Sequence, residues 1–153
     1  PDLKYVIIGY QNMASYFKEL KDLVADFGLK DRVIFLEKIS DNDLLKYYNS
    51  AELFVMTSIT EPDTVEGFGM VYLEAGACGT PVVGAYNTGA EAAISDNING
   101  FLVKHDPVEI ANAMRKILLD KNLAKILGTN GIKRAKEFNW DNIAKLYLKN
   151  LLD

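Results

Sequence analysis

The sequence predicts an α/β fold in which helices cover both faces of a parallel sheet. Short β-branched runs alternate with longer segments of helical periodicity along all 153 residues. Hydrophobic residues make up 49% of the chain, which is enough for an ordinary buried core. Strands separated by helices pair in parallel through right-handed crossovers. A single three-layer domain is therefore expected over residues 1–153.

The first 56 residues contain three expected strands and two expected helices. The strands are the apolar runs at 4–8, 33–36 and 53–56. Residues 14–27 place apolar side chains at helical spacing, and Gly28 is a typical helix stop. A second helix is expected over residues 41–48, directly after Ser40.

The remaining segments continue the alternation of helices and strands. The expected elements are a helix at 68–78, strands at 81–84 and 100–103, and helices at 108–119, 123–138 and 140–152. The segment Asp106-Pro107-Val108-Glu109 combines a helix cap, a first-turn proline and a capping-box glutamate. Gly76, which is unfavourable inside a helix, is expected to permit close packing of its helix on the sheet. Tyr47, Tyr48 and Trp140 are expected to anchor the core.

Charge and composition argue against several classes of protein. The formal charge is −4 and the pI is near 5.1, whereas duplex binding needs a basic footprint. No apolar run approaches the roughly 20 residues that span a bilayer, and no signal peptide is recognisable. The single cysteine, Cys78, gives no internal disulfide framework and is expected to be a small buried side chain. A cytoplasmic location is expected from this cysteine usage.

The segment from Glu66 to Glu74, E-G-F-G-M-V-Y-L-E, concentrates the features of a binding site. The turn Gly67-Phe68-Gly69 lets backbone N–H groups at a helix start approach an anionic phosphate. The apolar neighbours of Glu74 are expected to leave it little exposed area, and an ionised carboxylate is costly to bury unless several donors satisfy it. Vicinal ribose hydroxyls are such donors. The segment therefore predicts a nucleotide-sugar site.

The expected topology gathers further segments around this site. In open parallel sheets, ligands bind outside the carboxyl ends of the strands. Gly9, residues 37–39, residues 57–65 and residues 85–89 follow the expected strands and would share one edge with Glu66 and Gly67. The topology and the placement of the motif thus point to the same place.

The run from Val65 to Val103 resembles the retaining glycosyltransferases of family four. Their GT-B fold pairs two Rossmann-like domains across a cleft. The segments that carry the resemblance are Glu66-Gly67-Phe68-Gly69, Glu74-Ala75, residues 77–83, Thr88-Gly89 and residues 99–103. Weaker similarity extends through residues 31–36 and Phe138-Asn139-Trp140. The chain thus looks like the second, donor-binding domain, which is the C-terminal half of a GT-B fold.

The resemblance implies a role for each matching residue. Glu66 would be the catalytic residue that orients the donor sugar through its hydroxyls, and Glu74 would bind the ribose hydroxyls. Gly67, Phe68 and Gly69 would form the turn whose amides face the sugar or diphosphate.

Lys38 and Ile39 are the candidates for the base pocket, mostly through backbone contacts. The implied reaction is retaining transfer of a hexose from a UDP- or GDP-sugar to an acceptor alcohol in glycan or glycolipid synthesis. No metal or other cofactor is expected. Glu61 and Asp63 lack a clustered third ligand, and the only histidine, His105, is expected in a surface loop.

The sequence also departs from the family pattern. Thr88 stands where the family usually has glycine, Ala92 where it has glutamate, with Glu91 adjacent, and Glu37 where glycine is common. The basic pair that binds the diphosphate, the first strand and the acceptor domain, with its glycan or lipid partner, would precede Pro1.

The distribution of charge also indicates that cations needed to bind the diphosphate would lie outside this stretch of the chain. From Tyr47 to Val103 there are seven acidic residues and no lysine or arginine. A helix N-terminus offers about half a positive charge, which is too little to hold a diphosphate among carboxylates. Lys38 and Lys104 could add to it. The isolated chain is therefore expected to bind nucleotide sugars weakly and to turn none over.

Other functions remain open at this point. A nucleotide-sugar-binding domain without transferase activity has the same motifs, and a cleft-forming epimerase can share the fold. A phosphoacceptor signalling domain needs aspartates at its strand ends, but the first three strands are followed by Gly9, Glu37 and Thr57.

Overall fold

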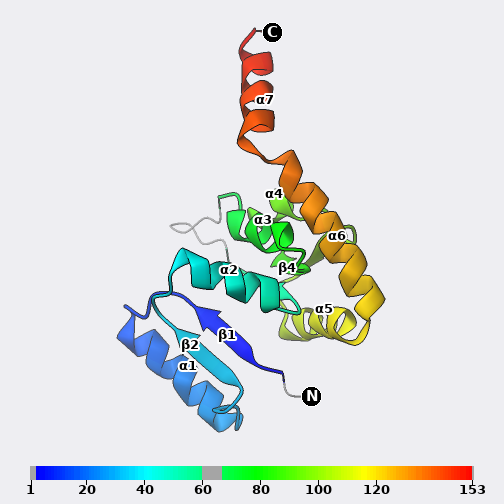
Figure 1. Cartoon of the computed structure of the whole chain (residues 1–153). Helices are drawn as coiled ribbons and strands as arrows, with labels where there is room; N and C mark the ends of the chain where they lie inside the picture. The colour runs from blue at the N-terminus through cyan, green and yellow to red at the C-terminus, as the bar shows by residue number, and fades with distance from the viewer. Residues whose placement is uncertain (1–2, 60–66, 153) are drawn as a thin grey trace. The chain divides into compact units, whose positions relative to one another are not determined.

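The computed structural model describes residues 3–59 and 67–152. The chain divides into two compact units, residues 1–44 and 45–153, and each is described here by itself. Parallel strands alternate with helices in both units (Figure 1), so the predicted α/β class is confirmed.

The first unit is a β-α-β arrangement. Strands β1 (Tyr5–Ile8) and β2 (Val33–Leu36) pair in parallel, with α1 (Ala14–Asp26) as the connection. Helix α1 packs on this pair, since the rings of Phe17 and Phe35 meet edge to face with centroids 5.2 Å apart. The three elements lie where the apolar patterns placed them.

The second unit contains a three-stranded parallel sheet in the order β3-β4-β5. These strands are β3 (Phe54–Val55), β4 (Val82–Ala85) and β5 (Gly100–Val103). Every residue of the central strand β4 is buried, as expected for a parallel strand covered on both faces. The described strands therefore form two parallel ladders, β1-β2 and β3-β4-β5, where the sequence predicted one sheet.

The helices agree with the predicted ones to within about two residues at most ends. They are α2 (Asp41–Ser50), α3 (Met70–Ala77), α4 (Ala90–Ala93), α5 (Pro107–Leu119), α6 (Lys121–Glu137) and α7 (Trp140–Leu152). Asp106 caps α5 by accepting hydrogen bonds from the amides of Val108 and Glu109, both at 2.9 Å. Helix α4 was not predicted, because four residues are too few to show helical periodicity.

The core of the second unit lies where α5 and α6 cover the sheet. It consists of Val83, Phe101, Val103, Ile117 and Leu127. Apolar residues of β3, α5 and α6 pack around this cluster. The core therefore fixes β4 and β5, whose carboxyl ends lead into the loops near the expected site.

Helix α3 packs against α6 through glycines. A Cβ atom on Gly76 would lie 3.3 Å from the carbonyl oxygen of Gly131, and one on Gly128 only 2.0 Å from that of Gly79. The expectation that Gly76 packs on the sheet is therefore wrong. Its missing side chain permits close approach of two helices instead.

Two of the three expected core aromatics are largely outside the core. Tyr48 is 8% exposed and does anchor the core, but Tyr47 is 36% exposed and Trp140 is 87% exposed. Trp140 opens α7, which leads away from α6 and whose described side chains are exposed or half-buried. Helical periodicity indicates an apolar face, but it cannot show whether anything covers that face.

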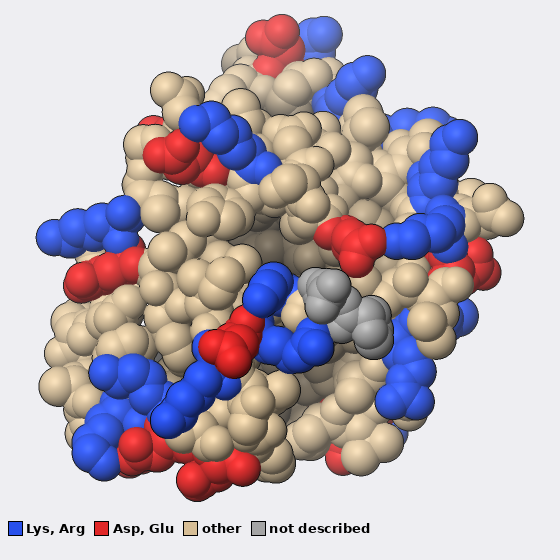
Figure 2. Space-filling model, turned by 60° about the horizontal axis from the view of Figure 1, so that its bottom comes forward, with Lys and Arg blue, Asp and Glu red and all other residues tan. Residues whose placement is uncertain are grey.

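The surface carries charges of both signs. Lysine and arginine side chains are interspersed with aspartate and glutamate on the face drawn in Figure 2. Within residues 3–59 and 67–152, no helix combines the length and apolar character that crossing a bilayer requires.

The close contact of Gly128 on α6 with Gly79, just after α3, predicts that one added methyl group will destabilise the protein strongly. Gly128→Ala should destabilise the protein by about 1–3 kcal/mol or more, because overpacking against backbone cannot relax through a rotamer change. Chemical unfolding of Gly128→Ala and of the wild type measures the difference. Gly67→Ala is the matched control, since a Cβ there meets nothing within 4 Å. Equal unfolding midpoints for all three proteins would contradict this packing.

Candidate donor-binding site

The start of α3 requires glycine and leaves its amides without a side-chain cap. Gly69, the N-cap residue, has φ of 70°, and a Cβ atom there would lie 2.6 Å from the ring of Tyr72. Gly69 itself has no side chain that could cap this helix start. The amide of Tyr72 donates to the carbonyl of Gly69 at 3.0 Å, whereas the N–H groups before it have no partner within a helix and can hydrogen-bond to an anion.

The glycine turn lies beside the loop that follows β4. A Cβ on Gly69 would be 3.4 Å from the carbonyl oxygen of Gly89, so the two backbones are close. The ring of Phe68 packs against Phe138 at the end of α6, with centroids 5.2 Å apart. Its side chain therefore serves packing, and its backbone is the part available to a ligand.

Thr88 and Glu91, in the segment that departs from the family pattern, support the loop after β4. The Thr88 hydroxyl donates to the carbonyl of Ala85 at 2.8 Å and accepts from the amide of Ala90 at 3.2 Å. Glu91 Oε1 accepts from the amide of Asn87 at 3.2 Å, where the backbone is left-handed with φ of 60°. Both side chains thus stabilise the turn.

Glu74 is exposed, contrary to the expectation that its apolar neighbours bury it. The buried residues of α3 are Tyr72, Ala75 and Gly76, whereas Met70, Glu74 and Ala77 form an exposed stripe along the helix. The apolar neighbours lie on more than one face of the helix, so they do not enclose the carboxylate. Glu74 is therefore open to a ligand.

One hydrogen bond orients this carboxylate. The hydroxyl of Tyr48, on α2, donates to Glu74 Oε2 at 3.0 Å. Burial, and then the charge of Glu74, raise the pKa of Tyr48 above its ordinary value, so the hydroxyl is protonated at neutral pH. The sequence indicated Tyr48 only as a core residue, although a tyrosine rather than a phenylalanine at a buried position signals a polar partner.

Cys78 lies one turn after Glu74 and is half-buried rather than buried. Burial and the neighbouring Glu74 carboxylate raise the pKa of its thiol. The Asn49 side-chain amide is 3.6 Å from its sulfur. The thiol is therefore a natural reporter of the charge on Glu74.

The structure brings some of the predicted site residues together on one element. Gly67, Phe68, Gly69 and Glu74 lie along the start and body of α3 in the second unit. Lys38, which is exposed, and Ile39, which is half-buried, connect β2 to α2 in the first unit. Glu66, Glu61 and Asp63 lie outside the described residues.

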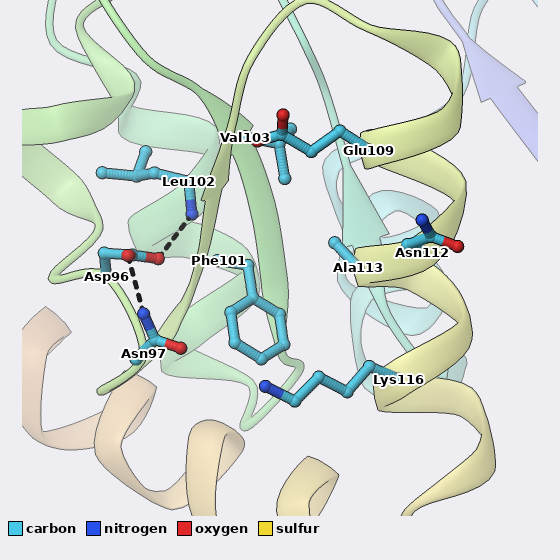
Figure 3. A pocket seen from close by; sticks show the side chains of 9 residues that line it. All are labelled: Asp96, Asn97, Phe101, Leu102, Val103, Glu109, Asn112, Ala113 and Lys116. Carbon is cyan, nitrogen blue, oxygen red and sulfur yellow. Dashed lines mark hydrogen bonds between the residues drawn. The ribbon is translucent and has the colours of Figure 1, made fainter.

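A separate pocket of about 280 Å³ lies along β5 and α5 (Figure 3). Asp96 Oδ1 accepts from the amide of Leu102, and Glu109 Oε1 from that of Lys104, both at 2.9 Å. The Lys116 ammonium lies 4.6 Å from the centroid of the Phe101 ring. This pocket shares no lining residue with α3. Its carboxylates bind the backbone in and just after β5, and Asp96 also accepts from the Tyr86 hydroxyl and the Asn97 side chain.

Metal ligands are not clustered in the described part of the chain. No three histidine, cysteine, aspartate or glutamate residues within 3–59 and 67–152 are placed to hold one ion. His105, exposed as expected, contacts the carbonyl of Thr57 through Nε2 at 2.8 Å.

Comparison with known proteins defines the class. The fold is the Rossmann-like C-terminal half of a GT-B fold, and it aligns over 96% of the chain with sucrose-phosphate synthase from Thermosynechococcus elongatus. That alignment has a TM-score of 0.80 and 32% identity and covers 38% of the synthase. The chain belongs to the family of glycosyl transferases group 1, whose family model matches residues 1–134.

Two further relatives bear on the site. The D-inositol 3-phosphate glycosyltransferase of Salinispora tropica is 38% identical over 135 residues, which are 88% of this chain and 26% of that protein. HepE of Anabaena, solved in complex with UDP, aligns over 99% of this chain and 41% of its own, with a TM-score of 0.85 and 28% identity. The chain thus spans about a quarter of the length of this curated relative.

The reactivity of Cys78 can test whether the Glu74 carboxylate raises the pKa of the thiol. In Glu74→Gln the thiol loses a neighbouring negative charge, so its pKa should fall and alkylation near neutral pH should become about threefold faster or more. The rate of iodoacetamide labelling against pH measures this, with Glu91→Gln as a control carboxylate on α4. An unchanged pH profile in Glu74→Gln would show that the two groups do not interact.

Proposed function

We propose that this chain is the donor-binding domain of a retaining glycosyltransferase that uses a UDP- or GDP-hexose. The observation that carries the proposal is the geometry of α3. One short helix presents uncapped amides at its start and an exposed, oriented carboxylate at Glu74. The complexes of HepE with UDP and with UDP-glucose support a nucleotide-sugar ligand.

Each group has a distinct proposed task. The Glu74 carboxylate accepts hydrogen bonds from the ribose hydroxyls. The amides of Phe68, Gly69 and the first turn of α3 stabilise the charge that develops on the leaving diphosphate. Such donors act strongly because they are fixed before the reaction and need not reorganise.

The remaining roles follow from the family resemblance. Glu66 orients the transferred sugar rather than acting as a base, and Lys38 and Ile39 contact the nucleotide base through their backbone. No metal or other cofactor takes part in this proposal. The reaction transfers the hexose with retention to an acceptor alcohol of a glycan or lipid, in the cytoplasm. Cations from outside residues 47–103 complete the diphosphate site, since that stretch has no lysine or arginine.

A donor screen tests the binding function. In the full-length protein, UDP- or GDP-sugars should raise the melting temperature, because a ligand at 100 times its Kd adds about 2.7 kcal/mol of stability. Glu74→Gln should weaken binding about tenfold or more through loss of a charged hydrogen-bond acceptor. No shift with any nucleotide sugar would refute the proposal, while binding without turnover would favour a non-catalytic domain.

The catalytic role of Glu66 requires kinetics. Glu66→Ala in the full-length enzyme should lower kcat more than it lowers donor affinity, because orientation of the sugar contributes most in the transition state. The measurements are kcat from initial rates at saturating donor, and donor Kd by calorimetry. A variant with wild-type kcat would exclude this role.

A further inference from the structure

Tyr48 connects α2 to the candidate ribose-binding carboxylate. Its hydroxyl lies 3.0 Å from Glu74 Oε2, and no residue in the described ranges hydrogen-bonds to Oε1. One oxygen of the carboxylate is thus held by the protein, and the other can accept a hydrogen bond from a ligand.

Tyr48 itself is held in place from several sides. It is 8% exposed, and its carbonyl oxygen accepts a hydrogen bond of 2.6 Å from the hydroxyl of Thr80, which is 3% exposed. Its ring packs edge to face on Phe54 with centroids 5.8 Å apart, and Phe54 packs in the same way on Tyr72 at 5.6 Å. The tyrosine hydroxyl is therefore a fixed donor.

A fixed hydrogen-bond donor limits the rotamers that an exposed glutamate side chain can sample. Glutamate has three rotatable bonds, and an exposed one samples many rotamers that a ligand must suppress on binding. A hydrogen bond from a rigid partner removes part of this freedom before the ligand arrives, which increases affinity. The effect applies only to ligands that use the oriented carboxylate.

We propose that Tyr48 is a positioning residue that orients Glu74 for the donor ribose and thereby sets the preference for ribose over sugars without its vicinal hydroxyls. This proposal rests on the proposed function, because it assumes that Glu74 meets the ribose. It assigns a ligand-selective task to a residue whose burial alone would indicate only a contribution to the core.

The test compares ribonucleotides with analogues that lack the ribose hydroxyls. Kd values for UDP and GDP and for their 2′,3′-dideoxy counterparts are measured by calorimetry in the full-length protein. The wild type should prefer the ribonucleotide by about tenfold or more, as expected for a charged hydrogen-bond acceptor. Tyr48→Phe should reduce that preference at least about threefold, while affinity for the dideoxy analogue stays within about twofold.

A purely structural role gives a different pattern. Loss of packing would weaken both nucleotides equally, so the preference would not change. Tyr47→Phe is the matched control, because it removes the same hydroxyl from the adjacent, more exposed position and should leave the preference intact. Thermal unfolding of each variant checks the fold. If Tyr48→Phe does not fold, Thr80→Val, which frees the Tyr48 carbonyl, should reduce the preference instead.

The outcomes separate this inference from the proposed function. A wild type that binds neither UDP nor GDP, or binds without preference for the ribonucleotide, refutes ribose binding by Glu74 itself. A wild-type preference that Glu74→Gln abolishes and Tyr48→Phe leaves unchanged supports ribose binding and overturns the role of Tyr48.

Discussion

The close packing of α3 on α6 is the constraint on which the site depends. Two glycine pairs, Gly76 with Gly131 and Gly79 (just after α3) with Gly128, let the backbones approach so closely that a Cβ on Gly76 or Gly128 would meet the opposite carbonyl oxygen at 3.3 or 2.0 Å. Because backbone atoms meet backbone atoms, this contact cannot shift by changing a rotamer. It fixes which stripe of α3 is buried and leaves Met70, Glu74 and Ala77 exposed. The position of Glu74 is thus a consequence of how two helices pack.

Among the described acidic side chains discussed above, the hydrogen-bond partners distinguish carboxylates that stabilise the chain from Glu74, which is open to a ligand. Glu91 and Glu109 each accept a hydrogen bond from a nearby backbone amide. Asp96 accepts one from the amide of Leu102 and further ones from the Tyr86 hydroxyl and the Asn97 side chain. Glu74 accepts its hydrogen bond from the hydroxyl of Tyr48 on another helix and, within residues 3–59 and 67–152, from no backbone amide. A backbone partner indicates that a carboxylate stabilises the chain locally. A rigid side-chain partner on an exposed carboxylate indicates that its orientation matters for something outside the protein.

Local pattern predicts the elements of this fold well and their surroundings less well. The helix over 108–119 was predictable because Asp106 and Pro107 carry a strong start signal, and the structure begins that helix at Pro107. The expected burial of Glu74 was wrong because neighbours in sequence occupy all faces of a helix. The exposure of Trp140 was missed for a related reason, since periodicity does not reveal what an apolar face contacts.

The contact between Glu74 and Tyr48, 26 positions apart, could not be predicted from sequence spacing, whereas the glycine turn at Gly67 to Gly69 could.

The most direct test of whether Tyr48 orients Glu74 toward a ribose is a crystal structure of the full-length protein with UDP or GDP. We expect a ribose hydroxyl within about 3 Å of Glu74 Oε1, the usual hydrogen-bond distance, with the Tyr48 hydroxyl still bonded to Oε2. A bound nucleotide whose ribose contacts other residues while Glu74 faces solvent would contradict this assignment.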